Sequence, residues 1–144
     1  MTVFHLGVGN CFAVKRWPMP RDWAQICSAE LDIGLVQFSF DLLDPRTIEP
    51  ALSQMISRIT DATHDAGVAI HSTFTGLAAY SLNLLTHPNP EMRIDALDWH
   101  ASAVELTSRL EVSGTGGHMG ALSCSDYKDI ERQRYLETIL VENV

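Results

Sequence analysis

The sequence predicts an α/β fold in which helices cover a parallel sheet. Four short apolar segments, each suited to a strand, alternate with four segments whose apolar residues recur at helical spacing. A strand, a helix and a second strand in that order form a right-handed unit whose two strands are parallel. Strict alternation along 144 residues therefore predicts a single domain of four βα units.

The first unit begins with a strand predicted over residues 3–8, an apolar run interrupted by a histidine and a glycine. Its helix is predicted to begin at Arg21 or Asp22, directly after Pro20, because proline fits a helix start. Apolar residues keep helical spacing as far as Leu31.

The second unit begins with a strand over residues 33–40, which are rich in β-branched and aromatic side chains. Thr47 is the predicted N-cap of the next helix, and Pro50 falls inside its first turn, where a missing N–H costs little. The helix is predicted to end near Ala66, with Gly67 as its C-cap glycine.

In the third unit a long loop is predicted between the strand and the helix, and long ordered loops in compact domains commonly carry function. A fourth helix, capped by Ser125 or Asp126, is predicted to run to the C-terminus. The preceding elements are predicted as a strand over 68–74, the loop over 76–90, a helix over 91–110 and a glycine-rich strand over 114–118.

Polar residues stand where the predicted strands end, which is where parallel α/β folds carry their chemistry. These ends offer Asn10, then Gln37 and Asp41, then His71, and finally His118. Because the strands on either side of a crossover helix are parallel, the two histidines are expected to face one shared pocket. Two histidines and a carboxylate there could hold a divalent metal, or act as acid and base on a small polar substrate.

Each of these residues also has a structural interpretation. A histidine that ends a strand is often a hydrogen-bonded structural residue, and Asp41 can be a turn-forming aspartate. His5, early in its strand, is expected to point away from the strand ends. In the long loop, Tyr80 and Asn83 are candidates to close over a substrate.

Composition argues against several classes of protein. A net charge of -8 without a basic patch opposes a nucleic-acid partner, and no apolar run suggests a membrane span or a signal peptide. Three sparse cysteines, Cys11, Cys27 and Cys124, are expected as reduced thiols in a cytoplasmic protein. The glycines of residues 114–120 do not fit a dinucleotide loop, because Met119 takes the place of its third glycine.

Four motifs stand at the ends of the predicted strands: LGVGNCFA at 6–13, QFSFD at 37–41, HSTFTG at 71–76 and GGHMG at 116–120. They resemble the sugar-phosphate isomerase/epimerase proteins of the xylose isomerase-like barrel superfamily, which also contains endonuclease IV. The resemblance covers nearly the whole chain. It implies the first four βα units of a parallel (β/α)8 TIM barrel, so that residues 1–144 are the N-terminal half of a domain truncated after its fourth unit.

The same resemblance implies a metal-dependent isomerase or epimerase of a small sugar or sugar phosphate, with tetrulose phosphates as one substrate class. His71 and His118 match the positions at which endonuclease IV-like members place two metal ligands. The metal would be divalent Mn, Mg, Zn or Co, and its site would be incomplete in this chain. The acid–base carboxylates of the family come from later strands and are expected beyond Val144.

Substrate contacts are expected from the remaining polar residues of the strand ends and the long loop. The expected substrate-binding residues are Asn10, Gln37, Asp41, Tyr80 and Asn83.

Two alternatives to this function stay open. One is an endonuclease IV-like phosphodiesterase, which the acidic charge opposes. The other is a non-catalytic half-barrel that serves as an assembly module. A half-barrel exposes two sheet edges and apolar faces, so a homo-oligomer is expected.

Overall fold

The computed structural model describes residues 4–143 and contains one parallel sheet with strand order β1-β2-β3-β4. Each strand is followed by a helix, which confirms the predicted α/β class. The strands are β1 (Val8–Gly9), β2 (Leu35–Ser39), β3 (Ala69–Phe74) and β4 (Thr115–Gly116). The α-helices are α1 (Pro20–Gln25), α2 (Ala51–Ala66), α3 (Pro90–Arg109) and α4 (Ile130–Glu142). A π-helical turn over Ile26–Glu30 continues α1, and short 3₁₀ turns span Asn10–Ala13 (η1), Ala78–Ser81 (η3) and Asp126–Lys128 (η4).

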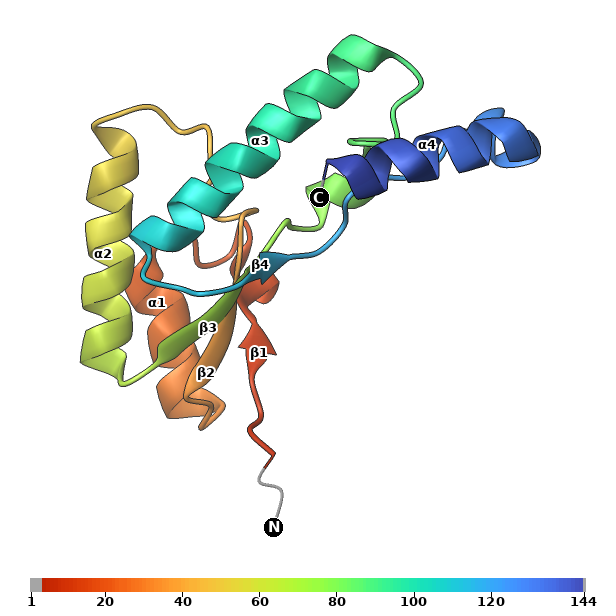
Figure 1. The fold of residues 1–144 in the computed structure, drawn as a ribbon. Coiled ribbons are helices and arrows are strands. Elements are labelled where there is room, and N and C mark those ends of the chain that lie inside the picture. The colour runs from red at the N-terminus through yellow and green to blue at the C-terminus, as the bar shows by residue number, and fades with distance from the viewer. Residues whose placement is uncertain (1–3, 144) are drawn as a thin grey trace.

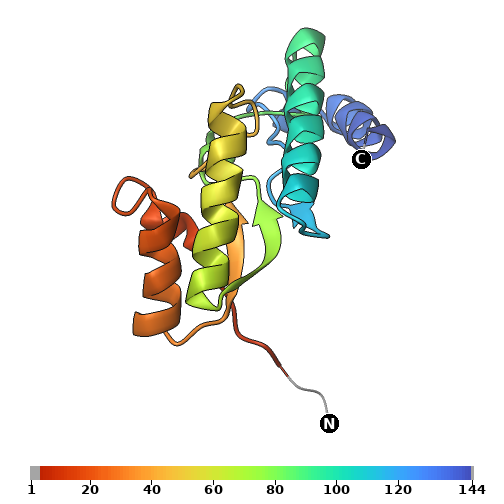
Figure 2. The same ribbon diagram turned by 90° about the vertical axis from the view of Figure 1, so that its left-hand side faces the viewer.

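Helices α1, α2 and α3 lie on one face of the sheet (Figures 1 and 2). No helix among residues 4–143 covers the opposite face, which we call the inner face. Helix α4 extends away from the sheet beyond β4 (Figure 1). None of the described helices combines the length and apolar character needed to cross a membrane.

The hydrophobic core fills the space between the sheet and α1–α3. On β2, Val36 and Phe38 are buried in this core, whereas Gln37 between them is exposed, as the alternation of a strand requires. Phe38 lies 6.1 Å from Trp23 of α1, measured between ring centroids. The core therefore fixes which face of β2 is free for a ligand.

Strand β3 contains a bulge that changes the facing of its side chains. Val36 pairs with Ile70, but the next residue, Gln37, pairs with Ser72, so His71 is the extra residue. A bulge re-aims side chains and is common beside functional sites. Here it brings both His71 and Ser72 to the cavity on the inner face described below.

Several predicted element boundaries differ from the structure. Of the strand predicted over 3–8, Val3 lies outside the described residues, and β1 is limited to Val8 and Gly9, the two positions that pair with β2. Strand β4, predicted over 114–118, ends at Gly116 because Gly117 adopts φ +126° and leaves the extended conformation.

The predicted helix caps are partly wrong. The Thr47 hydroxyl donates to the carbonyl of Asp44 in a turn, and α2 begins only at Ala51, with Pro50 as its N-cap. Gly67 is the left-handed C-cap of α2, as predicted. Helix α4 is capped by Asp129, which accepts from the backbone N–H groups of residues 131 and 132, rather than by Ser125 or Asp126.

Candidate functional site

The carboxyl ends of the four parallel strands meet along one edge of the sheet, as they do in every parallel α/β fold. The polar residues at this edge are joined by hydrogen bonds and one aromatic stack. We call this group the rim cluster, and its members are Asn10, Ser39, Asp41, Thr75, Tyr80 and His118.

The first link of the rim cluster joins β1 to β2. Asn10 is fully buried, and its side-chain oxygen accepts from the backbone N–H of Ser39 at 2.7 Å. Its Nδ2 has no hydrogen-bond partner among the described residues. Asn10, predicted to bind substrate, is therefore directed at the protein interior and not at the inner face.

The second link joins β2 to the loop after β3. The Asp41 carboxylate accepts from the backbone N–H of Leu77 at 2.7 Å and of Ala78 at 3.2 Å. It also accepts from the Ser39 hydroxyl at 2.9 Å. Asp41 thus caps the 3₁₀ turn η3, which carries Tyr80.

The third link joins this loop to the segment after β4. The ring of Tyr80 stacks on that of His118, with centroids 4.7 Å apart and planes inclined by 17°. The backbone N–H of His118 donates to the Thr75 hydroxyl at 2.8 Å. His118 Nε2 is buried and has no partner within the described residues, while 60% of Tyr80 is exposed. We call the stacked rings of Tyr80 and His118 the aromatic wall; its Tyr80 side is exposed.

Asn83 also lies in the long loop, but its side chain faces the protein. Its Nδ2 donates to the Ala121 carbonyl at 2.6 Å, and the adjacent Leu84 pairs with Gly120 in an antiparallel bridge. These bonds fasten the loop to the segment that carries His118. The bond to Ala121 gives Asn83 a structural role in this loop, and its expected contact with a substrate stays a prediction.

His71 lies on the inner face, apart from the rim cluster. It lines a cavity of about 430 Å³ together with His5, Gln37 and Ser72. Gln37 Nε2 donates to the Ser72 hydroxyl at 3.2 Å, which joins β2 and β3 across this surface. His5, which the sequence assigned to a structural role, is exposed at the same cavity, and only the three-dimensional path of the chain before β1 reveals it.

The two histidines therefore have different surroundings. His71 is the bulge residue inside β3, and His118 lies beyond the end of β4, so the single shared pocket predicted from the sequence is not formed. Among residues 4–143, no group of three or more His, Cys, Asp or Glu side chains is placed to hold a metal ion. These residues alone do not fit the divalent metal that the resemblance implies.

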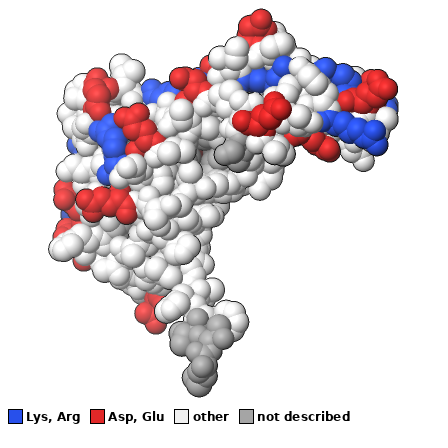
Figure 3. Space-filling view, viewed as in Figure 1, with Lys and Arg blue, Asp and Glu red and all other residues white. Residues whose placement is uncertain are grey.

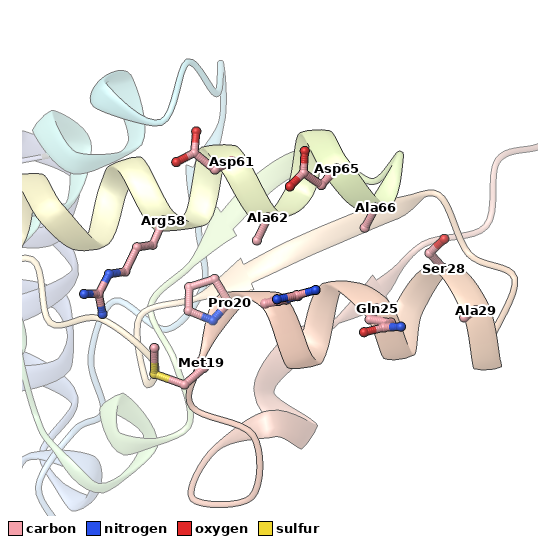
Figure 4. Close-up of a pocket in the computed structure, with 11 residues that line it drawn as sticks. Met19, Pro20, Gln25, Ser28, Ala29, Arg58, Asp61, Ala62, Asp65 and Ala66 are labelled. Atoms are coloured by element: carbon pink, nitrogen blue, oxygen red, sulfur yellow. The ribbon is translucent and has the colours of Figure 1, made fainter.

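A larger groove, about 600 Å³, lies between α1 and α2 (Figure 4). Arg58, Asp61 and Asp65 of α2 border it on one side, and Met19 and Gln25 border it on the other. The groove lies on the helical layer, away from the carboxyl ends of the strands. Folds of this class bind their substrates at the carboxyl ends of the strands, so this groove is not where a substrate is expected.

Charged side chains are absent from much of the surface above the sheet in the view of Figure 3 and gather over the helices instead. There, acidic and basic groups are interspersed. This face presents no continuous basic surface to a phosphate backbone, which a nuclease of duplex DNA would need.

No protein-family model and no curated protein matches the sequence. Solved structures do match. A candidate xylose isomerase from Rhodospirillum rubrum ATCC 11170 shares 31% identity with a TM-score of 0.91, over 98% of this chain and 48% of that one. D-psicose 3-epimerase from Clostridium cellulolyticum H10, solved with D-tagatose, shares 13% identity with a TM-score of 0.58, over 97% and 50%.

A further D-psicose 3-epimerase structure, determined in the presence of D-fructose, shares 9% identity with a TM-score of 0.58, again over 97% of this chain and 50% of that one. At these identities the two epimerases support the fold alone. The chain spans about half the length of the solved structures that it matches.

Proposed function

Since this chain has the architecture of one half of a xylose isomerase-like barrel, we propose that it forms the N-terminal half of an isomerase or epimerase for a small sugar or sugar phosphate. The observation that carries the proposal is the match to the Rhodospirillum rubrum protein over 98% of this chain at a TM-score of 0.91. Tetrulose phosphates are the substrate class that the sequence resemblance suggests.

The chain's own residues suit it to hold and orient a polyhydroxylated ligand. Gln37 and Ser72 are already hydrogen-bonded to each other on the inner face and offer further donors and acceptors to hydroxyl groups. At the rim, the exposed ring of Tyr80 offers an apolar surface to the C–H face of a sugar. His71 and His118 stay proposed as ligand-facing groups of the inner face and the rim.

Acid–base chemistry needs groups beyond those that these residues offer. Where epimerisation or ketose–aldose isomerisation moves a proton next to a carbonyl, it requires a carboxylate or a similar base at the reacting carbon. Asp41 is the carboxylate of the rim cluster, and its oxygens already accept three hydrogen bonds. We therefore propose that the base, and the remaining ligands of any metal, come from the other half of the barrel.

The proposal is tested by locating where sugars bind. The chain has a mass of 16.0 kDa, which suits two-dimensional amide NMR. Titration with ketoses and ketose phosphates should shift the signals of Gln37, Ser72, Tyr80 and His118, and should leave those of the groove between α1 and α2 in place. Signals that move only in that groove, or no response to any sugar, would contradict the proposal.

A pair of histidine variants tests the ligand-facing assignment. His71→Ala combined with His118→Ala should weaken sugar binding, whereas His64→Ala should not, because His64 is an exposed histidine of α2. Equal affinity in the double variant and the parent chain would show that the two histidines have no part in the site.

A further inference from the structure

We propose that Asp41 is a positioning residue that holds Tyr80 against His118. Through it, the end of β2 fixes the aromatic wall at the end of β4. The inference rests on the proposed function in taking this wall as part of the sugar site. It gives Asp41 a role different from the direct substrate contact expected from the sequence.

The carboxylate of Asp41 is almost fully used by the protein. A carboxylate can accept about four hydrogen bonds. Asp41 accepts from the two successive backbone N–H groups at the start of η3 and from the Ser39 hydroxyl. Bonds from backbone N–H groups to an ionised acceptor are among the stronger ones in proteins. The Asp41 carboxylate therefore has little remaining capacity to accept a hydrogen bond from a substrate hydroxyl, whereas its bonds to the loop are strong.

Two glycines permit the close approach that this arrangement needs. A Cβ added at Gly76, which has φ +92°, would lie 2.6 Å from Asp41 Oδ1. A Cβ at Gly117, which has φ +126°, would collide with the Thr75 hydroxyl, the acceptor for the His118 N–H. The missing side chain of Gly76 leaves room for the Asp41 carboxylate that holds the turn of Tyr80. The missing side chain of Gly117 leaves room for the Thr75 hydroxyl that accepts from the His118 N–H.

The remaining contacts of Tyr80 do not fix its ring. Its backbone N–H bonds to the Leu77 carbonyl within the same turn, so this bond moves with the turn. Tyr80 is 60% exposed, and its ring meets that of His118 on one side. Asp41 is the link between this turn and the rigid end of β2, and loss of the link should release the ring.

Three variants of the chain, with Tyr80→Leu as a reference for the lost stack, test this inference by NMR without any sugar. Asp41→Ala removes the acceptor, and Asp41→Asn keeps one acceptor oxygen in nearly the same shape. Asp44→Ala is the matched control, because Asp44 accepts the backbone N–H of Arg46 within its own turn. The two readouts are amide hydrogen exchange at Leu77 and Ala78, and the ring-current shift of the His118 ring protons.

In Asp41→Ala, exchange at the two amides should become faster by about tenfold or more, the expected effect of losing a bond to a charged acceptor. The His118 ring protons should move to the positions that they take in Tyr80→Leu, which removes the stacked ring. Asp41→Asn should fall between Asp41→Ala and the parent chain, and Asp44→Ala should match the parent chain.

The inference is overturned if Asp41→Ala, or Asp41→Asn should the alanine variant not fold, leaves both the amide exchange and the His118 ring shifts at their parent values. If Asp41→Ala loses the stack and the parent chain binds no sugar, the result supports this role of Asp41 and contradicts the proposed function. If the parent chain binds sugar and both Asp41 variants keep the stack, the result supports the proposed function and contradicts this role of Asp41.

Discussion

Phe38→Ala should strongly destabilise the domain, because this side chain joins the sheet to its helical layer. Phe38 is 1% exposed, and its ring centroid lies 6.1 Å from that of Trp23 and 6.4 Å from that of Phe40. Truncation of a buried phenylalanine costs about 3–5 kcal/mol, since the cavity closes only in part. That is a large share of the roughly 5–15 kcal/mol by which a native domain is stable.

Urea unfolding followed by tryptophan fluorescence measures this loss, because Trp23 packs against the substituted ring. With a slope of about 2 kcal/mol per molar urea, the midpoint should fall by about 2 M. Phe4→Ala is the matched control. Its side chain is 92% exposed, so its unfolding free energy should change by less than about 0.5 kcal/mol.

A role of Phe38 in joining the sheet to the helices is refuted if the two phenylalanine variants lower the midpoint equally, or if Phe38→Ala lowers it by less than about 0.5 M, a quarter of the expected shift at this slope. Either outcome would mean that the sheet and the helices are not held together through this contact. The conclusion that the Gln37 side chain points to the inner face, which depends on burial of Phe38 on the opposite face, would then be unsupported.

Three further outcomes are expected. Gly117→Ala should lower the unfolding free energy by about 1 kcal/mol or more, because φ +126° strains any L-residue. Thermal unfolding measures this loss, with Gly114→Ala as the control. Hydrogen bonding, above all from the Ser123 hydroxyl, lowers the pKa of Asp126 below its usual 3.8. The ionised Asp126 carboxylate therefore stabilises the folded chain above pH 3.8, and this stabilisation is lost as the pH falls through the lower pKa of the folded state. In an acid titration followed by NMR, η4 should be ordered at neutral pH and should loosen in acid. Burial raises the pKa of the Cys27 thiol, so a thiol reagent followed by mass spectrometry should label exposed Cys124 well before Cys27.

Local sequence signals predicted the elements that depend on local chemistry. The alternation of strands and helices follows from apolar periodicity, and the end of α2 follows from the need for a residue that accepts a left-handed conformation at Gly67. The start of α4 was missed because Ser125, Asp126 and Asp129 are all good capping residues. Only the path of the chain through η4 selects Asp129.

The same distinction applies to the candidate site. Parallel strands bring their carboxyl ends together, so the placement of Asp41 and His118 along one edge was predictable. The bulge at His71 was not, because it depends on how β3 pairs with β2. Nor was the capping of η3 by Asp41, because it depends on contacts between residues that are 36 and 37 positions apart in the chain.

The most direct test of the account is proton exchange at the carbon next to a sugar carbonyl. The protein as isolated from the cells that produce it would be incubated in D₂O, with Mn, Mg, Zn or Co added in turn, with a panel of ketoses and ketose phosphates that includes tetrulose phosphates. Deuterium should enter that carbon of one substrate as its epimer or isomer forms, and His71→Ala with His118→Ala should reduce the rate. Neither deuterium nor an epimer or isomer in any sugar of the panel, from a protein that still binds these sugars, would contradict the proposed isomerase or epimerase function.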